Sequence, residues 1–134
     1  MATRNFPSLN QSNILKLVTL DVMLQGNGTS TPTLSYGDPK GTYFSAPVNV
    51  GTGSFTITTQ DAYPQYVGCN LEYITATASA TTCAVIAPLP VQNANGTWTF
   101  TINCFTASFA AVIASTSMIS FTVFMQNTND PYAG

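Results

Sequence analysis

The segment Thr97–Cys104, TWTFTINC, has the most regular alternation of apolar and polar residues in this 134-residue chain. Its apolar phase consists of Trp98, Phe100, Ile102 and Cys104, and its other phase is neutral and polar. A period of two is typical of a strand with one buried and one exposed face. The Asn95-Gly96 dipeptide before it is a hairpin-type turn. The segment therefore predicts a strand that is entered from a tight turn.

Similar patterns extend in both directions along the chain. The further predicted strands are Ile14–Leu24, Thr42–Val50, Ser54–Thr59, Tyr66–Ala78, Cys83–Ala87 and Met118–Gln126, with a short edge strand at Thr33–Tyr36. Gly, Pro and Asn turns separate them. This spacing predicts an all-β fold: a single antiparallel β-sandwich or jelly-roll-like barrel of about eight short strands with extended terminal arms. The arm covers residues 1–13, the β domain residues 14–126 and the C-terminal tail residues 127–134.

The same patterns predict several local features. A bulge is expected near Val18, where the apolar phase changes. Pro47 indicates a strand at a sheet edge, because proline cannot donate a ladder hydrogen bond. Val67 is expected to point inward on the phase of Cys69, and Phe105–Ala114 is expected to include a short helical turn.

Charge is the most unusual feature of the composition. Only eight residues are charged, or 6%, against about 25% in a typical domain, and 57 consecutive residues between Glu72 and Asp130 carry none. Without a basic stripe, a nucleic-acid binder is excluded. Without histidine, His-dependent triads and His-ligated metal sites are excluded, and we expect no cofactor. Because 45% of the chain is apolar, a disordered chain is also excluded.

The uncharged half of the chain raises the question of a membrane span. Phe105–Met125 has the length of a bilayer-crossing helix. However, seven of its 21 residues are Ser or Thr and its end alternates with period two, so we expect no membrane contact. Residues 1–13 lack the apolar core of a signal peptide, so no secretory entry is expected.

Candidate catalytic groups are sparse. Cys69, Cys83 and Cys104 are an odd set, for which buried free thiols are favoured and one disulfide with a spare thiol stays open. The carboxylates are Asp21, Asp38, Asp61, Glu72 and Asp130, and no pair is suggested locally. We expect solvated surface or turn residues rather than a glycosidase pair. The sequence therefore predicts that the protein is not an enzyme.

Asn-Gly-Thr occurs twice, at residues 27–29 and 95–97, and Asn10-Gln11-Ser12 is a third match to the glycosylation sequon. Chance explains such triplets in a chain rich in Asn, Ser and Thr, and two of them are turn dipeptides. We interpret them as turns.

Aromatic residues gather in or near the predicted loops, and we expect them to be exposed. They are Tyr36, Tyr43, Phe44, Tyr63 and Tyr66. A carbohydrate-binding platform would stack sugars on such rings, but edge packing or a subunit contact is the favoured interpretation. A sparsely charged surface is tolerated when neighbours cover it, because interface cores are depleted in charged residues and enriched in aromatic ones. The composition thus indicates an oligomer or a component of a larger assembly.

Three segments carry a family resemblance: Leu17–Thr33 (LVTLDVMLQGNGTSTPT), Gly51–Pro64 (GTGSFTITTQDAYP) and Met118–Gln126 (MISFTVFMQ). Together they resemble small virion proteins of tailed bacteriophages, many of them capsid-associated. The resemblance implies an antiparallel β domain that coats the head shell, often as trimers, and cements capsomers. It implies no catalytic residues, and synthesis in a reducing host cytoplasm favours free thiols.

The sequence therefore predicts a non-enzymatic decoration or cement protein on the capsid surface of a virion. Its expected partners are the major capsid protein and further copies of itself in a homotrimer. The alternative is a receptor- or glycan-binding knob of a tail fibre or spike, with Tyr36, Tyr63 and Tyr66 as contacts. The candidate partner-binding residues are Arg4, Phe6, Tyr36, Tyr43, Tyr63, Tyr66 and Tyr132.

Overall fold

The computed structural model describes residues 17–38, 40–75, 82–106, 109–110, 113 and 116–127. All regular elements within these residues are strands. They are β1 (Leu17–Gln25), β2 (Thr33–Leu34), β3 (Val48–Gly51), β4 (Ser54–Thr58), β5 (Gln65–Ile74), β6 (Thr82–Ile86), β7 (Val91–Gln92), β8 (Trp98–Thr106), β9 (Phe109–Ala110) and β10 (Met118–Gln126). Arm residues 1–13 and tail residues 128–134 lie outside the described part of the chain.

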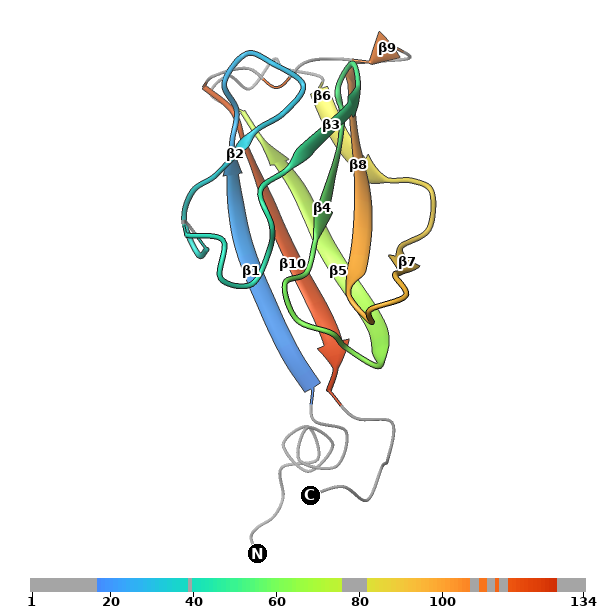
Figure 1. Cartoon of the computed structure of the whole chain (residues 1–134). Helices are drawn as coiled ribbons and strands as arrows, with labels where there is room; N and C mark the ends of the chain where they lie inside the picture. Colours follow the sequence, from blue (N-terminus) through green and yellow to red (C-terminus); the bar gives the residue numbers. More distant parts are fainter. Residues whose placement is uncertain are drawn as a thin grey trace, which may run out of the picture.

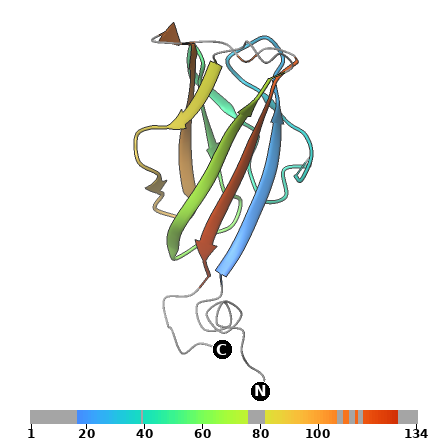
Figure 2. The same cartoon turned by 180° about the vertical axis from the view of Figure 1, so that it is seen from behind.

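The strands form two antiparallel sheets that face each other (Figure 1). The four-stranded sheet has the order β2-β1-β10-β5 and is seen from its outer side in Figure 2. The six-stranded sheet has the order β3-β4-β8-β6, with β7 and β9 also paired to β8. Two separate sheets make a β-sandwich rather than a closed barrel. The predicted all-β, antiparallel fold is confirmed.

The core lies where the central strands of the two sheets meet. Phe100 of β8 and Phe121 of β10 are both fully buried, with ring centroids 5.3 Å apart. The ring centroid of Phe44 lies 5.7 Å from that of Phe121, and the ring centroid of Tyr66 lies 5.5 Å from that of Phe100. The alternation of Thr97–Cys104 is confirmed, because its apolar phase supplies the centre of this cluster.

The other predicted strands are confirmed where the structure describes them, but residues 14–16 of the strand predicted over Ile14–Leu24 and residues 76–78 of the strand predicted over Tyr66–Ala78 lie outside the described residues. The strand predicted over Thr42–Val50 shortens to β3, which follows Pro47 and lies at a sheet edge as expected. The bulge predicted near Val18 is wrong, because β1 pairs with β10 from Leu17 to Gln25 without a register shift. In place of a helical turn within Phe105–Ala114, the described residues there end β8 and form β9.

The inward orientation predicted for Val67 is also wrong. Phe124 of β10 pairs with Gly68 and Met125 pairs with Tyr66, so that Val67 is an extra residue in β5. This bulge reverses the phase of the strand. Val67 is consequently 54% exposed, and Tyr66 packs against the core in its place.

The turn predicted at Asn95-Gly96 is confirmed. Gly96 has a φ of +88°, and a Cβ atom on it would lie 2.8 Å from the Cβ of Ala62. Only glycine fits both the dihedral angle and the contact. The turn leads from β7 into β8 and places the 61–64 loop beside the hairpin, since the Tyr63 N–H donates to the Gly96 carbonyl at 3.0 Å.

Replacement of Phe100 by alanine is expected to lower the free energy of unfolding by about 3–5 kcal/mol, because it leaves a cavity between the sheets. Thr101→Ala, on the outer side of the same strand, is the matched control and is expected to cost less than about 1 kcal/mol. Urea denaturation followed by the fluorescence of Trp98 measures both. Equal losses for the two variants would contradict the assignment of inner and outer faces.

Candidate functional site

The two sheets differ in charge. The four-stranded sheet carries Asp21 on β1 and Glu72 on β5, whereas the six described strands of the other sheet contain no Asp, Glu, Lys or Arg. We call the outer side of the six-stranded sheet the charge-free face. It includes Val48, Thr56, Thr58, Val85, Val91, Thr99, Thr101 and Asn103. The 57-residue stretch without charge supplies most of this face.

Threonines form the middle of the charge-free face. Thr56 pairs with Thr101 across β4 and β8, and Thr58 pairs with Thr99. The hydroxyls of the second pair share a hydrogen bond of 3.0 Å. Covering neutral hydroxyl and methyl groups costs much less free energy than removing water from ions. This face can therefore be buried by a neighbour without an ionic partner.

Exposed aliphatic side chains surround the threonines. Val48 and Val91 are more than half exposed, on β3 and β7 respectively, and Val85 is exposed on β6. Leu89, in the connection between β6 and β7, is 85% exposed. Apolar groups of this size in one region are typical of an interaction surface.

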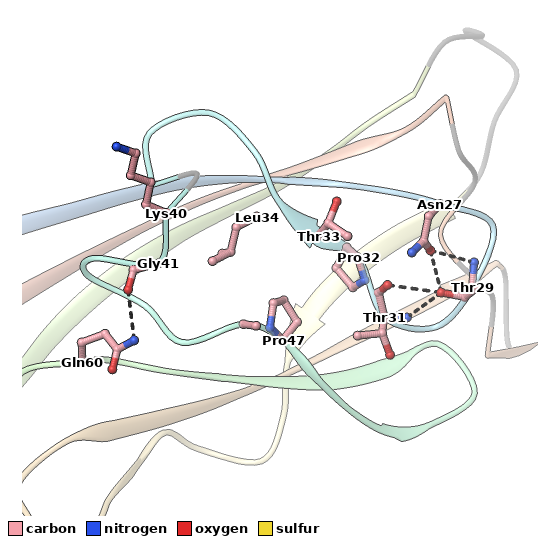
Figure 3. A pocket seen from close by; sticks show the side chains of 11 residues that line it. Asn27, Thr29, Thr31, Pro32, Thr33, Leu34, Lys40, Gly41, Pro47 and Gln60 are labelled. Atoms are coloured by element: carbon pink, nitrogen blue, oxygen red, sulfur yellow. Dashed lines mark hydrogen bonds between the residues drawn. The ribbon is translucent and has the colours of Figure 1, made fainter.

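A groove with a volume of about 700 Å³ lies along the side of the sandwich, between β2 and the chain that enters β3 (Figure 3). Its lining consists of Asn27, Thr29, Thr31, Pro32, Thr33, Leu34, Lys40, Gly41, Ala46, Pro47 and Gln60. Figure 3 shows Pro32, Leu34 and Pro47 in the middle, between a polar end at Asn27 and another at Lys40. The groove thus has an apolar centre and hydrogen-bonding ends.

The Asn27 end of the groove is a tight turn. The side-chain oxygen of Asn27 accepts hydrogen bonds from the N–H and the hydroxyl of Thr29, at 3.1 and 2.6 Å. Asn95 makes the same pair of bonds to Thr97, at 3.1 and 2.7 Å. The two Asn-Gly-Thr segments are therefore turns of one kind, as the sequence predicts. Asn10 lies outside the described residues.

Lys40 stands at the opposite end of the groove. It is the single Lys or Arg within the described residues, and no ion pair joins it to any of them. The neighbouring Gly41 carbonyl accepts a hydrogen bond of 3.0 Å from the Gln60 side chain, which links this end of the groove to the segment after β4. Among the described residues, the groove therefore offers a ligand one positive charge that no ion pair neutralises.

Asp38 holds the loop that carries Lys40. It is only 2% exposed, and its carboxylate accepts three backbone hydrogen bonds, from the N–H groups of Thr42 (2.6 Å), Tyr43 (2.9 Å) and Phe44 (2.8 Å). The sequence predicted that Asp38 is a solvated surface residue or a turn residue. The prediction of a solvated residue is wrong, because consecutive backbone amides replace water around the carboxylate. The signal in the sequence was weak: an Asp-Pro turn with a glycine three residues after the aspartate.

The predicted cluster of exposed rings is only partly present. Tyr36 and Tyr43 are exposed, at 70% and 45%, but neither lines the groove. The prediction is wrong for Phe44 and Tyr63, which are buried in the core, and Tyr66 is half-buried against Trp98 and Phe100. The predicted contacts Arg4, Phe6 and Tyr132 lie outside the described residues.

Tyr63 connects two parts of the structure through its backbone carbonyl. Its carbonyl accepts hydrogen bonds of 2.9 Å from the Trp98 indole and from the Gln92 side chain. Burial, and secondarily Asp61, raises the pKa of Tyr63, and burial together with Cys69 raises the pKa of Tyr66 to about 12. These phenols stay neutral at physiological pH. The backbone carbonyl of Tyr63 fastens the loop before β5 to the hairpin of β7 and β8.

The three cysteines are free thiols: Cys104 is buried, Cys69 is half-buried and Cys83 is exposed. The expectation of burial is thus wrong for Cys83, which lies on the outward phase of β6. Burial raises the pKa of Cys104 to about 11. Within the described residues, no group of three or more His, Cys, Asp or Glu side chains could hold a metal ion.

No protein-family model, no curated protein and no solved structure matches the chain. In the part of the chain that the structure describes, no helix has the length and hydropathy needed to cross a membrane. Function is therefore inferred from two surfaces, the charge-free face and the groove.

Replacement of Asp38 by alanine is expected to lower the free energy of unfolding by about 3 kcal/mol or more, because three backbone N–H groups lose a charged acceptor. Amide hydrogen exchange at residues 42–44 should accelerate together with the loss of stability. The exposed Asp61 is the matched control, and Asp61→Ala should change stability by about 0.5 kcal/mol or less. Unchanged exchange at residues 42–44 in Asp38→Ala would contradict the assigned hydrogen bonds.

Stability is expected to fall as the pH rises from 9 to 11. The pKa of the Cys104 thiol is 9.0 ordinarily and about 11 in the folded protein, so in this range only the unfolded chain releases the proton. The stabilisation is complete below pH 9 and is lost through pH 11. Urea denaturation from pH 8 to 11 should show a smaller fall for Cys104→Ala than for Cys83→Ala. Equal pH dependence in the two variants would refute the attribution to Cys104.

Proposed function

We propose that this protein is a non-enzymatic structural protein of a phage virion, which decorates and stabilises the capsid by binding the major capsid protein. The observation that carries the proposal is the charge-free face, the outer side of a sheet whose described strands contain no Asp, Glu, Lys or Arg. The resemblance of three segments to capsid-associated proteins of tailed phages agrees with it.

The physical argument is that this face suits burial. A surface of threonine and valine loses little free energy of hydration when a partner covers it, whereas a typical surface must lose the hydration of many ions. A decoration protein repeats each contact over many symmetry-related sites. Modest contacts then give large total stability to the shell through multivalency.

The proposal also includes self-association, as a homotrimer on the capsid surface after synthesis in the host cytoplasm. Low surface charge supports it, because single domains that stay separate in solution usually carry more charge. The groove and its lone Lys40 are a second surface through which copies could meet.

The glycan-binding alternative has lost its support. It required Tyr36, Tyr63 and Tyr66 to present their rings together, but Tyr63 is in the core and Tyr66 is covered by Trp98 and Phe100. Of these three tyrosines, only Tyr36 is exposed.

A charge on the charge-free face should prevent binding to capsids. Thr101→Lys places an ammonium in the middle of that face on β8. Thr122→Lys is the matched control, because Thr122 occupies the outer side of the central strand β10 in the other sheet and pairs with Asp21. We expect the first variant to lose at least tenfold in affinity for shells assembled without this protein, and the second to bind as the wild type does.

Co-sedimentation with such shells, followed by cryo-electron microscopy, measures affinity and position. Absence of wild-type binding to shells would refute the proposal. Equal binding of the two lysine variants would show that the charge-free face is not the contact.

A further inference from the structure

We propose that the groove between β2 and β3 receives residues 128–134 of a second copy of this chain. The inference rests on the self-association that the proposed function includes and deepens it, because it assigns a contact between copies to a surface other than the charge-free face. It holds or fails independently of capsid binding.

The shape and chemistry of the groove indicate how an occupant would be held. Its middle is apolar and is formed by Pro32, Leu34 and Pro47 (Figure 3). Proline has no N–H to offer, so β2 and β3 are poorly suited to accept an added strand on this side. The occupant is therefore held by its side chains, with an apolar or aromatic group in the middle of the groove.

The charge of Lys40 favours one of the two terminal segments outside the described residues as the occupant. Lys40 has no ion pair with any described residue, so the occupant should bring a carboxylate. Residues 1–16 contain Arg4 and Lys16 and no acid, and Lys40 repels them. Residues 128–134, TNDPYAG, contain Asp130 as their single charge, followed by Pro131 and Tyr132.

The spacing within this segment fits the groove. Asp130 and Tyr132 are two residues apart, or about 7 Å in an extended chain. In the groove, Lys40 is followed by Gly41, where a Cβ atom would lie 3.4 Å from the Leu34 side chain. One short segment can thus place a carboxylate at Lys40 and an aromatic ring over Leu34.

Chain length indicates that the segment comes from a second copy. Leu34 pairs with Leu24, whereas Gln126 pairs with Leu17 at the opposite end of β1, seven residues away or about 23 Å. Tyr132 is six residues beyond Gln126, a reach of about 20–22 Å when fully extended. Because β10 runs away from Leu34, the chain would have to reverse and then stay fully extended to place Tyr132 over its own Leu34, whereas the same segment of a second copy is under no such constraint.

Charge reversal tests the contact on the full chain. Lys40→Glu and Asp130→Lys should each weaken self-association about tenfold or more, and the double variant should restore it. Tyr132→Ala should weaken it as well, while the exposed Tyr36→Ala is the matched control and should not. Sedimentation velocity measures the association constants, and thermal melts verify that each variant folds.

A monomeric wild type, or a double variant that does not recover, would overturn the inference. A second measurement locates the segment: a photo-crosslinking amino acid in place of Tyr132, in a mixture of isotopically labelled and unlabelled protein. We expect crosslinks between copies to residues 32–34 or 46–47. Crosslinks within one copy would reject the inference. Crosslinks to the groove from the same amino acid placed at position 6 would reject it as well. Shell binding by the same variants separates this result from that of the proposed function.

Discussion

The contact between Phe100 and Phe121 is the constraint on which the molecule depends. These rings join the central strands of the two sheets, and their neighbours along each strand follow from the period of two. Because every second residue of β8 points into this contact, every other one must point outward. The threonines of the charge-free face are therefore the consequence of the same alternation that fills the core.

The parts of the fold that depend on local pattern could be predicted from the sequence. The apolar phase of Thr97–Cys104, the hairpin at Gly96 and the edge position of the strand after Pro47 all follow from neighbouring residues. Val67 could not be predicted, because the bulge exists only in the register between β5 and β10. The inward phase that the sequence indicates for β5 is correct for the residues after the bulge. It is reversed for the residues before the bulge.

The candidate site was less accessible to sequence reasoning. The carboxylate of Asp38 is surrounded by the backbone amides of residues 42–44, which the turn folds back onto it. The Tyr63 carbonyl is held by the indole of Trp98, 35 residues away in the chain. Composition indicated that the surface lacks charge, but not that the lack is concentrated on one sheet. The groove arises where edge strands of different sheets meet, and no single segment contains it.

The bulge at Val67 has a further consequence for the behaviour of the protein at high concentration. β5 is a ten-residue strand at the edge of its sheet, and a straight strand of this length is a template on which chains stack into fibrils. The extra residue and the nearby Glu72 interrupt that template. The bulge and the charge therefore hinder pairing of β5 with the same strand of another copy.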